Sequence, residues 1–165
     1  MPRLSPYNDK YEFTGKTKKV KGRIVWQIRR KDTKEEGGWI EGEFNLSFND
    51  TCWVAEDAAV FASATVRENA QISGQARIYG KAQISGSASV TGSAEVCGCC
   101  WVYENASVHG SAILSGQSLI LGNARIHGRA RVYGSAWVWG NADVSEAVIV
   151  SGSGQLRSGS FISGE

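Results

Sequence analysis

Residues 52–164 carry a hydrophobic pattern with a period of six. A large aliphatic residue occupies every position whose number is a multiple of six, and a small residue, mostly alanine, lies two positions before it from Ala58 to Ala142. An amphipathic helix would place apolar residues three and four apart, and a half-buried strand would alternate every second residue. The pattern therefore predicts a short strand and a corner in every repeat. The nineteen aliphatic positions are Val54, Val60, Val66, Ile72, Ile78, Ile84, Val90, Val96, Val102, Val108, Leu114, Ile120, Ile126, Val132, Val138, Val144, Val150, Leu156 and Ile162.

Each repeat contains a signal for its corner. The small residue and the aliphatic residue lie two apart, so in a strand they point to the same side. From Gly74 onward a glycine lies two positions after the aliphatic residue, except at Glu104, Glu146 and Ser158. Glycine adopts positive φ without a steric penalty and therefore suits a tight corner. A strand, a corner and a regular repeat predict a solenoid, in which each unit packs only on its neighbours.

This repeat is similar to that of the hexapeptide-repeat proteins, whose fold is the left-handed parallel β-helix. The resemblance covers 52–164. In that family three repeats form one triangular coil, which implies that residues three repeats apart lie directly above one another. Nineteen repeats then imply about six coils. We expect an all-β protein with a left-handed parallel β-helix over 52–165 and a small N-terminal β cap over 1–51.

The first fifty residues do not follow the repeat. Residues 11–13 and 20–30 read as a pair of strands joined by a turn rich in glycine and lysine. We expect this hairpin to cover the first coil, because an uncapped solenoid end exposes strand edges and core side chains. Leu46 and Phe48 are already in phase with the repeat, so the solenoid can begin one repeat early.

A second resemblance concerns the same opening segment. The stretches 18–20, 22–23, 37–41, 45–47 and 52–54 are similar to the leader of hexapeptide-repeat proteins found in phages, prophages and bacteria. Those relatives usually carry a transferase label or none. The resemblance implies an origin in this group, and the segment before Gly37 is shorter here than in those relatives.

Composition narrows the functional classes. The formal net charge is only +2 and no acidic or basic tail dominates, so general nucleic-acid binding is not expected. No apolar run reaches the length of a membrane span, and the chain opens with a polar segment rather than a signal peptide. Three of the four cysteines are crowded into residues 97–100, where bridges are awkward. We expect free thiols and a reducing, cytoplasmic setting.

One outward face of the predicted helix is apolar. Residues immediately before and after each aliphatic residue face solvent, and the eighteen-residue spacing gathers six large apolar side chains into two columns. Such a patch covers about 400 Å² or more, and tryptophan and tyrosine are favoured interface anchors. We expect a homo-oligomer, a dimer or a trimer; coverage by the cap or by a foreign protein is the alternative. The six residues are Trp101, Tyr103, Leu119, Leu121, Trp137 and Trp139.

Another face carries the two histidines, His109 and His127, one coil apart. Many hexapeptide-repeat enzymes use a histidine as general base in acyl transfer from CoA, so the resemblance implies an acyltransferase with acyl-CoA as co-substrate. The uninterrupted repeat opposes this reading, because small-molecule sites are concave and these faces are flat. No metal site is expected. The carbonic-anhydrase branch of the fold needs three histidines, and Cys97 and Cys99 lack a partner pair.

The sequence favours a binding protein over an enzyme. We expect a self-associating, non-enzymatic β-helical scaffold without a cofactor, which presents flat faces to a macromolecular partner. The phage-like leader makes an inhibitor or decoy of a bacterial protein one form of this prediction. The alternative is a CoA-dependent acyltransferase with His109 or His127 as base.

Overall fold

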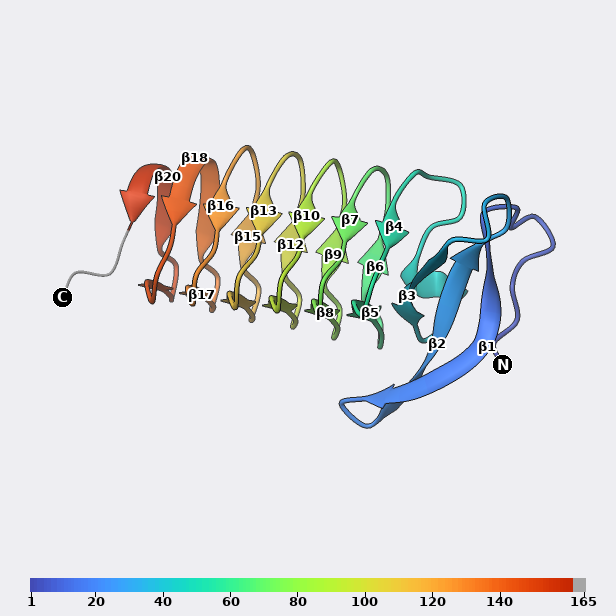
Figure 1. Cartoon of the computed structure of the whole chain (residues 1–165). Helices are drawn as coiled ribbons and strands as arrows, with labels where there is room; N and C mark the ends of the chain where they lie inside the picture. Colours follow the sequence, from blue (N-terminus) through green and yellow to red (C-terminus); the bar gives the residue numbers. More distant parts are fainter. Residues whose placement is uncertain (162–165) are drawn as a thin grey trace.

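The computed structural model describes residues 1–161, which form an all-β rod of parallel coils stacked over about seven turns (Figure 1). This confirms the predicted parallel β-helix with a β cap at its N-terminal end. Helix is confined to one turn, Glu43–Asn45, within the described residues. No helix in this part of the chain has the length and apolar character needed to cross a membrane.

Each coil contributes one short strand to each of three faces. The hairpin face is the one that continues into the N-terminal hairpin. Its inward side chains are buried, and every step along it from β5 onward is eighteen residues. Its strands are β3 (Glu36–Ile40), β5 (Ala59–Val60), β8 (Arg77–Ile78), β11 (Glu95–Val96), β14 (Ile113–Leu114), β17 (Arg131–Val132) and β19 (Ile149–Val150).

The other two faces share the long strand β18 (Trp137–Val144), which crosses the corner between them. The tryptophan face comprises β6 (Thr65–Val66), β9 (Gln83–Ile84), β12 (Trp101–Val102), β15 (Leu119–Ile120), the start of β18, and β20 (Gln155–Phe161). The histidine face comprises β4 (Trp53–Val54), β7 (Gln71–Ile72), β10 (Ser89–Val90), β13 (Ser107–Val108), β16 (Arg125–Ile126) and the end of β18.

The rod begins earlier than the repeat count predicts. Ile40 pairs with Val60, and Leu46 bridges to Val66, so both aliphatic residues belong to a first coil that Val54 completes. Both residues are fully buried. The chain takes two extra residues between Leu46 and Val54, which hides this coil from a strict period of six. The rod therefore has about seven coils, where the repeat count gave about six.

At the other end the register slips by one residue. Val138 pairs with Leu156, eighteen residues on, but Val144 pairs with Phe161, seventeen residues on. The corner glycine is replaced by Ser158, and Gly159 takes the positive φ, +98°, instead. The last coil thereby has one residue fewer at this corner, and Gly159 pairs with Ala142. Phe161, which packs partly buried against the core, takes the place predicted for Ile162, a residue outside the described part of the chain.

The N-terminal cap is an antiparallel hairpin of β1 (Tyr11–Val20) and β2 (Arg23–Arg30). Its second strand, β2, also pairs antiparallel with β3. Tyr11 and Ile28 are fully buried against the first coil, and the Tyr11 hydroxyl donates to Leu46 O at 2.8 Å. A bulge lies between Phe13 and Thr17, where Gly15 has φ +92°. Beyond this bulge the hairpin extends beside the rod instead of staying at its end (Figure 1).

Candidate functional site

The register of the tryptophan face assembles the predicted apolar columns. Trp101 pairs with Leu119, and Leu119 pairs with Trp137, so these three side chains form one column over three consecutive strands. Gln83 precedes the column and Gln155 follows it. The column therefore begins and ends in polar residues.

The second column runs beside the first, one residue beyond each inward aliphatic. It contains Tyr103, Leu121 and Trp139, and coil-to-coil hydrogen bonds hold its backbone: Tyr103 N donates to Ile120 O and Leu121 N to Val138 O, both at 3.0 Å. Because every strand is tied to the next in this way, the two columns are held on a rigid surface.

The tryptophan face has relief as well as exposed apolar area. Trp101 and Trp137 are 49% and 46% exposed, and the shorter Leu119 between them is only partly exposed. The second column has the same order, because the shorter Leu121 lies between the aromatic side chains of Tyr103 and Trp139. Leucines thus form a low strip between two aromatic strips.

Both ends of the apolar columns have features that can receive a neighbour. Toward the N-terminus, a shallow hollow of about 260 Å³ is lined by Gln83, Ser85, Trp101 and Tyr103. Toward the C-terminus, the Arg157 guanidinium lies over the Trp139 ring at 4.8 Å. The Nε1 group of Trp139 is buried without a hydrogen-bond partner, and buried N–H groups normally have one.

The N-terminal hairpin lies on the hairpin face, not on the tryptophan face. Val20 and Val25 of the hairpin pack against Ala59 and Phe61. Lys21 also pairs with Glu95, Nζ to Oε1 at 3.0 Å. This placement rules out the alternative in which the cap covers the apolar columns.

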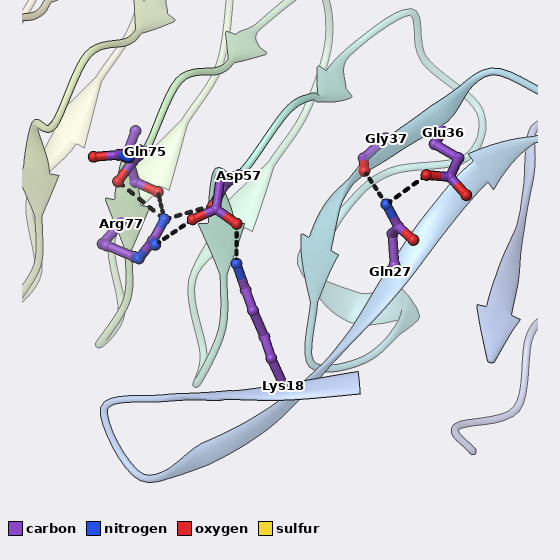
Figure 2. A network of polar contacts seen from close by, with 8 residues as sticks. Lys18, Gln27, Glu36, Gly37, Asp57, Gln75 and Arg77 are labelled. Carbon is purple, nitrogen blue, oxygen red and sulfur yellow. Dashed lines mark hydrogen bonds and ion pairs between the residues drawn. The ribbon is translucent and has the colours of Figure 1, made fainter. Parts of the chain in front are cut away.

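Figure 2 shows the polar part of this hairpin contact. Lys18 reaches from β1 to the carboxylate of Asp57, which also accepts a hydrogen bond from Arg77 Nη2 at 2.9 Å. Burial raises the pKa of Asp57. The hydrogen bonds from Lys18 and Arg77 together lower it by more, so the net pKa lies below its ordinary value. The far half of the hairpin is therefore attached by an ion-pair network as well as by apolar contacts.

The histidine face places the two imidazoles together. The His109 and His127 rings stack with their centroids 4.9 Å apart and their planes within 7°. Asp143 approaches His127, Oδ1 to Nε2 at 2.6 Å. Burial lowers the pKa of His109, and the neighbouring His127 and Arg125 lower it further, against a raising effect of Asp143. His109 is thereby favoured in its neutral form, the form that accepts a proton.

The cysteines and acidic residues form no metal centre among residues 1–161: no group of three or more histidine, cysteine, aspartate or glutamate side chains is placed to hold an ion. All four cysteines are free thiols. Cys100 is buried in an inward small-residue position, where its Sγ lies 3.1 Å from Ser118 Oγ, whereas Cys97 and Cys99 are partly or fully exposed.

The eighteen-residue spacing also predicts the polar residues on either side of the columns, but not the hollow beside Trp101 or the stacking of Arg157 on Trp139. Arg157 and the hollow at Gln83 and Ser85 belong to the same face, and the eighteen-residue spacing that gathers the aromatics also places these residues. In the sequence, these polar residues are recognised by their spacing from the aromatic residues and not by their residue type. No protein-family model and no curated protein sequence matches this chain.

Proposed function

We propose that this protein is a non-enzymatic β-helical scaffold that self-associates through the tryptophan face and presents its remaining faces to a protein partner. One observation carries the proposal: six large apolar side chains lie in two adjacent columns on one face, with Trp101 and Trp137 each about half exposed. Contiguous patches of this kind mark interaction sites on soluble proteins.

The energetics of the face support association. A tryptophan side chain offers up to about 250 Å² of surface, so covering the exposed half of one indole removes roughly 100 Å² from water. At about 25 cal/mol per Å² this stabilises the contact by roughly 2–3 kcal/mol for each tryptophan. Two such residues on each of two copies supply about 10 kcal/mol, within the range of about 4–15 kcal/mol that association costs in lost freedom.

The scaffold part of the proposal rests on rigidity. Consecutive coils are joined by backbone hydrogen bonds on all three faces, and their inward side chains are buried from Ile40 to Val150. A surface that is already ordered loses little conformational entropy when a partner binds. An inhibitor or decoy of a bacterial protein, as the phage-like leader suggests, is the form of partner binding that we propose.

Sedimentation velocity or light scattering tests self-association. We expect the wild type to form a dimer or trimer at tens of micromolar and Trp137→Glu to be monomeric, because a charge would be buried in the contact. Ile149→Glu is the matched control, since Ile149 is 60% exposed but lies on the hairpin face. A monomeric wild type, or equal effects of the two substitutions, would overturn the proposal.

A second candidate function, CoA-dependent acyl transfer, is favoured by the histidine pair. His109 has a lowered pKa, and Asp143 holds the adjacent His127, so a neutral base lies beside an oriented imidazole. Calorimetry with acetyl-CoA separates the two functions. Binding that His109→Ala and His127→Ala both abolish would favour the acyltransferase and replace the scaffold.

A further inference from the structure

We propose that the partner of the tryptophan face is a second copy that runs antiparallel to the first and is displaced from strand-over-strand alignment by half a coil. In this arrangement Trp137 and Trp139 of each copy enter the hollow lined by Gln83, Ser85 and Trp101 of the other. The inference rests on the proposed self-association and adds its geometry.

The relief of the face carries the half-coil displacement. Two copies aligned strand over strand, with β15 over β15, would bring aromatic strips against aromatic strips and keep the leucine strips apart. Close-packed interfaces instead place the large side chains of one partner between those of the other. The hollow before Trp101 is the natural seat for an indole, and it lies between β9 and β12, not over a strand.

The two-fold symmetry then fixes every other contact. If β18 of one copy lies over the gap between β9 and β12 of the other, β12 lies over the gap between β15 and β18. The leucines of β15 lie over the gap between β12 and β15. All six apolar side chains thus face gaps, and the same surface serves both copies, as an isologous contact requires.

Charge favours the antiparallel direction. In this register Arg157 of one copy lies over the gap between β6 and β9 of the other. The carboxylate of Glu68 lies at the adjoining corner, where its Oε2 accepts from Gly86 N. Glu68 thus supplies an anion for Arg157 and offsets the like charge of Arg67, which directly precedes it in the chain. Two parallel copies would instead bring both Arg157 side chains to the same end and both Arg67 side chains to the other, and like charges opposed across an interface are unfavourable.

The contact must also extend beyond the apolar columns. The aromatic and leucine strips alone cover about 400 Å², roughly half of the 800 Å² that each partner buries in a stable interface of ordinary size. The proposed register brings the polar ends of the face, from Glu68 to Arg157, into the contact. The surface beyond the apolar columns is needed for a stable dimer, and this arrangement uses it.

Cross-linking between two differently tagged copies tests the direction. In a Cys97→Ser, Cys99→Ser background, Asn141→Cys is mixed with Ser87→Cys and treated with a short bismaleimide. Both corner positions, and Ser135, are exposed. The antiparallel register places 141 beside 87, whereas a parallel dimer or trimer places 141 beside 135, so Ser135→Cys is the matched control.

We expect the 141–87 product to exceed the 141–135 product by at least about tenfold. A predominant 141–135 product from an oligomer would overturn the antiparallel arrangement and leave self-association standing. A protein that is monomeric by light scattering and yields neither product would overturn both.

A charge exchange provides a second test that does not depend on cross-linking. Arg157→Glu and Glu68→Arg should each weaken the dimer about three- to tenfold, and the double variant should recover most of this loss. Additive losses in the double variant would contradict the proposed pairing. Circular dichroism of each variant establishes that the rod is folded.

Discussion

At the scale of single residues, the corners decide how tightly the coils stack. Most corner positions have positive φ, and they are filled mainly by glycine. Glutamate at a corner has a structural reason at two positions. Glu104 adopts φ +59°, and its carboxylate accepts a hydrogen bond from Gly122 N in the next coil at 2.6 Å. Glu56 does the same for Gly74 N. The carboxylate satisfies a backbone donor, which offsets part of the strain of a left-handed non-glycine residue.

A pair of glycine substitutions separates backbone strain from stacking. Gly86 and Gly152 both have φ +65°, but an added Cβ at Gly86 would lie 2.6 Å from Glu104 N, whereas at Gly152 it would meet nothing within 4 Å. We expect Gly152→Ala to lower the free energy of unfolding by about 1 kcal/mol and Gly86→Ala by about 2–4 kcal/mol. Urea denaturation at matched concentration measures both. Equal losses would show that stacking at the corner adds nothing.

The lowered pKa of His109 predicts a pH dependence. Because its folded-state pKa lies below the ordinary value of 6.5, the unfolded chain binds a proton first as the pH falls. His109 therefore stabilises the fold fully above about pH 6.5, and this contribution is lost as the pH falls toward the folded pKa. Arg125, His127 and Asp143 are the charged groups that face it. Thermal melts between pH 7.5 and 5 should show a shallower slope for His109→Gln than for the wild type; parallel slopes would contradict this.

At the scale of elements, the N-terminal hairpin does two things. Its first half closes the core through Tyr11 and Ile28, and its second half lies along the hairpin face. Gly15, at the bulge between the halves, has a positive φ that allows the change of direction.

The strand pair was readable from the sequence, but its turn was misplaced: residues 14–19, expected to form the turn, continue β1, and the chain turns at Lys21 and Gly22. The bend of the hairpin was not readable, because the contacts that stabilise the bend come from Asp57, Phe61 and Glu95, more than thirty residues further along the chain.

Removing the carboxylate that anchors the hairpin should loosen its second half. Asp57→Asn deprives both Lys18 and Arg77 of their anion, whose side chain is about half exposed, so we expect a loss of about 1 kcal/mol. Lys16→Met is the control, because the Lys16–Glu36 pair is more exposed, at 60% and 54%, and should contribute less. Hydrogen exchange of β1 and β2 measures the difference.

Acid should produce the same effect in the wild type. The net pKa of Asp57 is lowered in the folded state, so its contribution is complete above its ordinary pKa of 3.8 and is lost as the pH falls through the lower folded value. Exchange of β1 that rises equally in the wild type and in Asp57→Asn on acidification would contradict this.

At the scale of the whole molecule, the two ends of the described rod differ. The N-terminal coil is closed by fully buried side chains, whereas in the last coil Leu156 and Phe161 are only partly buried. A solenoid unit is stabilised mainly by its neighbours, so a coil with a neighbour on one side only and thin packing opens most readily.

This asymmetry predicts a gradient of backbone opening. Amides of β20 should exchange with solvent about 10–1,000 times faster than those of β9 and β12, while β2 and β3 should be protected nearly as well as the centre. Hydrogen exchange by mass spectrometry of the Trp137→Glu variant measures this without the proposed second copy. Protection that is uniform along the rod would contradict it.

The sequence by itself determined the period and the inward residues, and its resemblance to the hexapeptide-repeat proteins implied the three-faced coil. These follow from local rules, since an aliphatic residue, a small residue and a corner glycine can stack in few ways. It therefore also determined that Trp101, Leu119 and Trp137 share a column and that His109 lies beside His127.

Only the tertiary structure decided the features that depart from the period or depend on distant contacts. The first coil needs two extra residues, the last has one residue fewer at its corner, and the hairpin occupies the face that offers Asp57 and Phe61. The physical reason is the range of the interactions. A repeat encodes contacts between neighbouring coils, whereas the ends of the rod lack a neighbour and are completed by whichever distant segment packs best there.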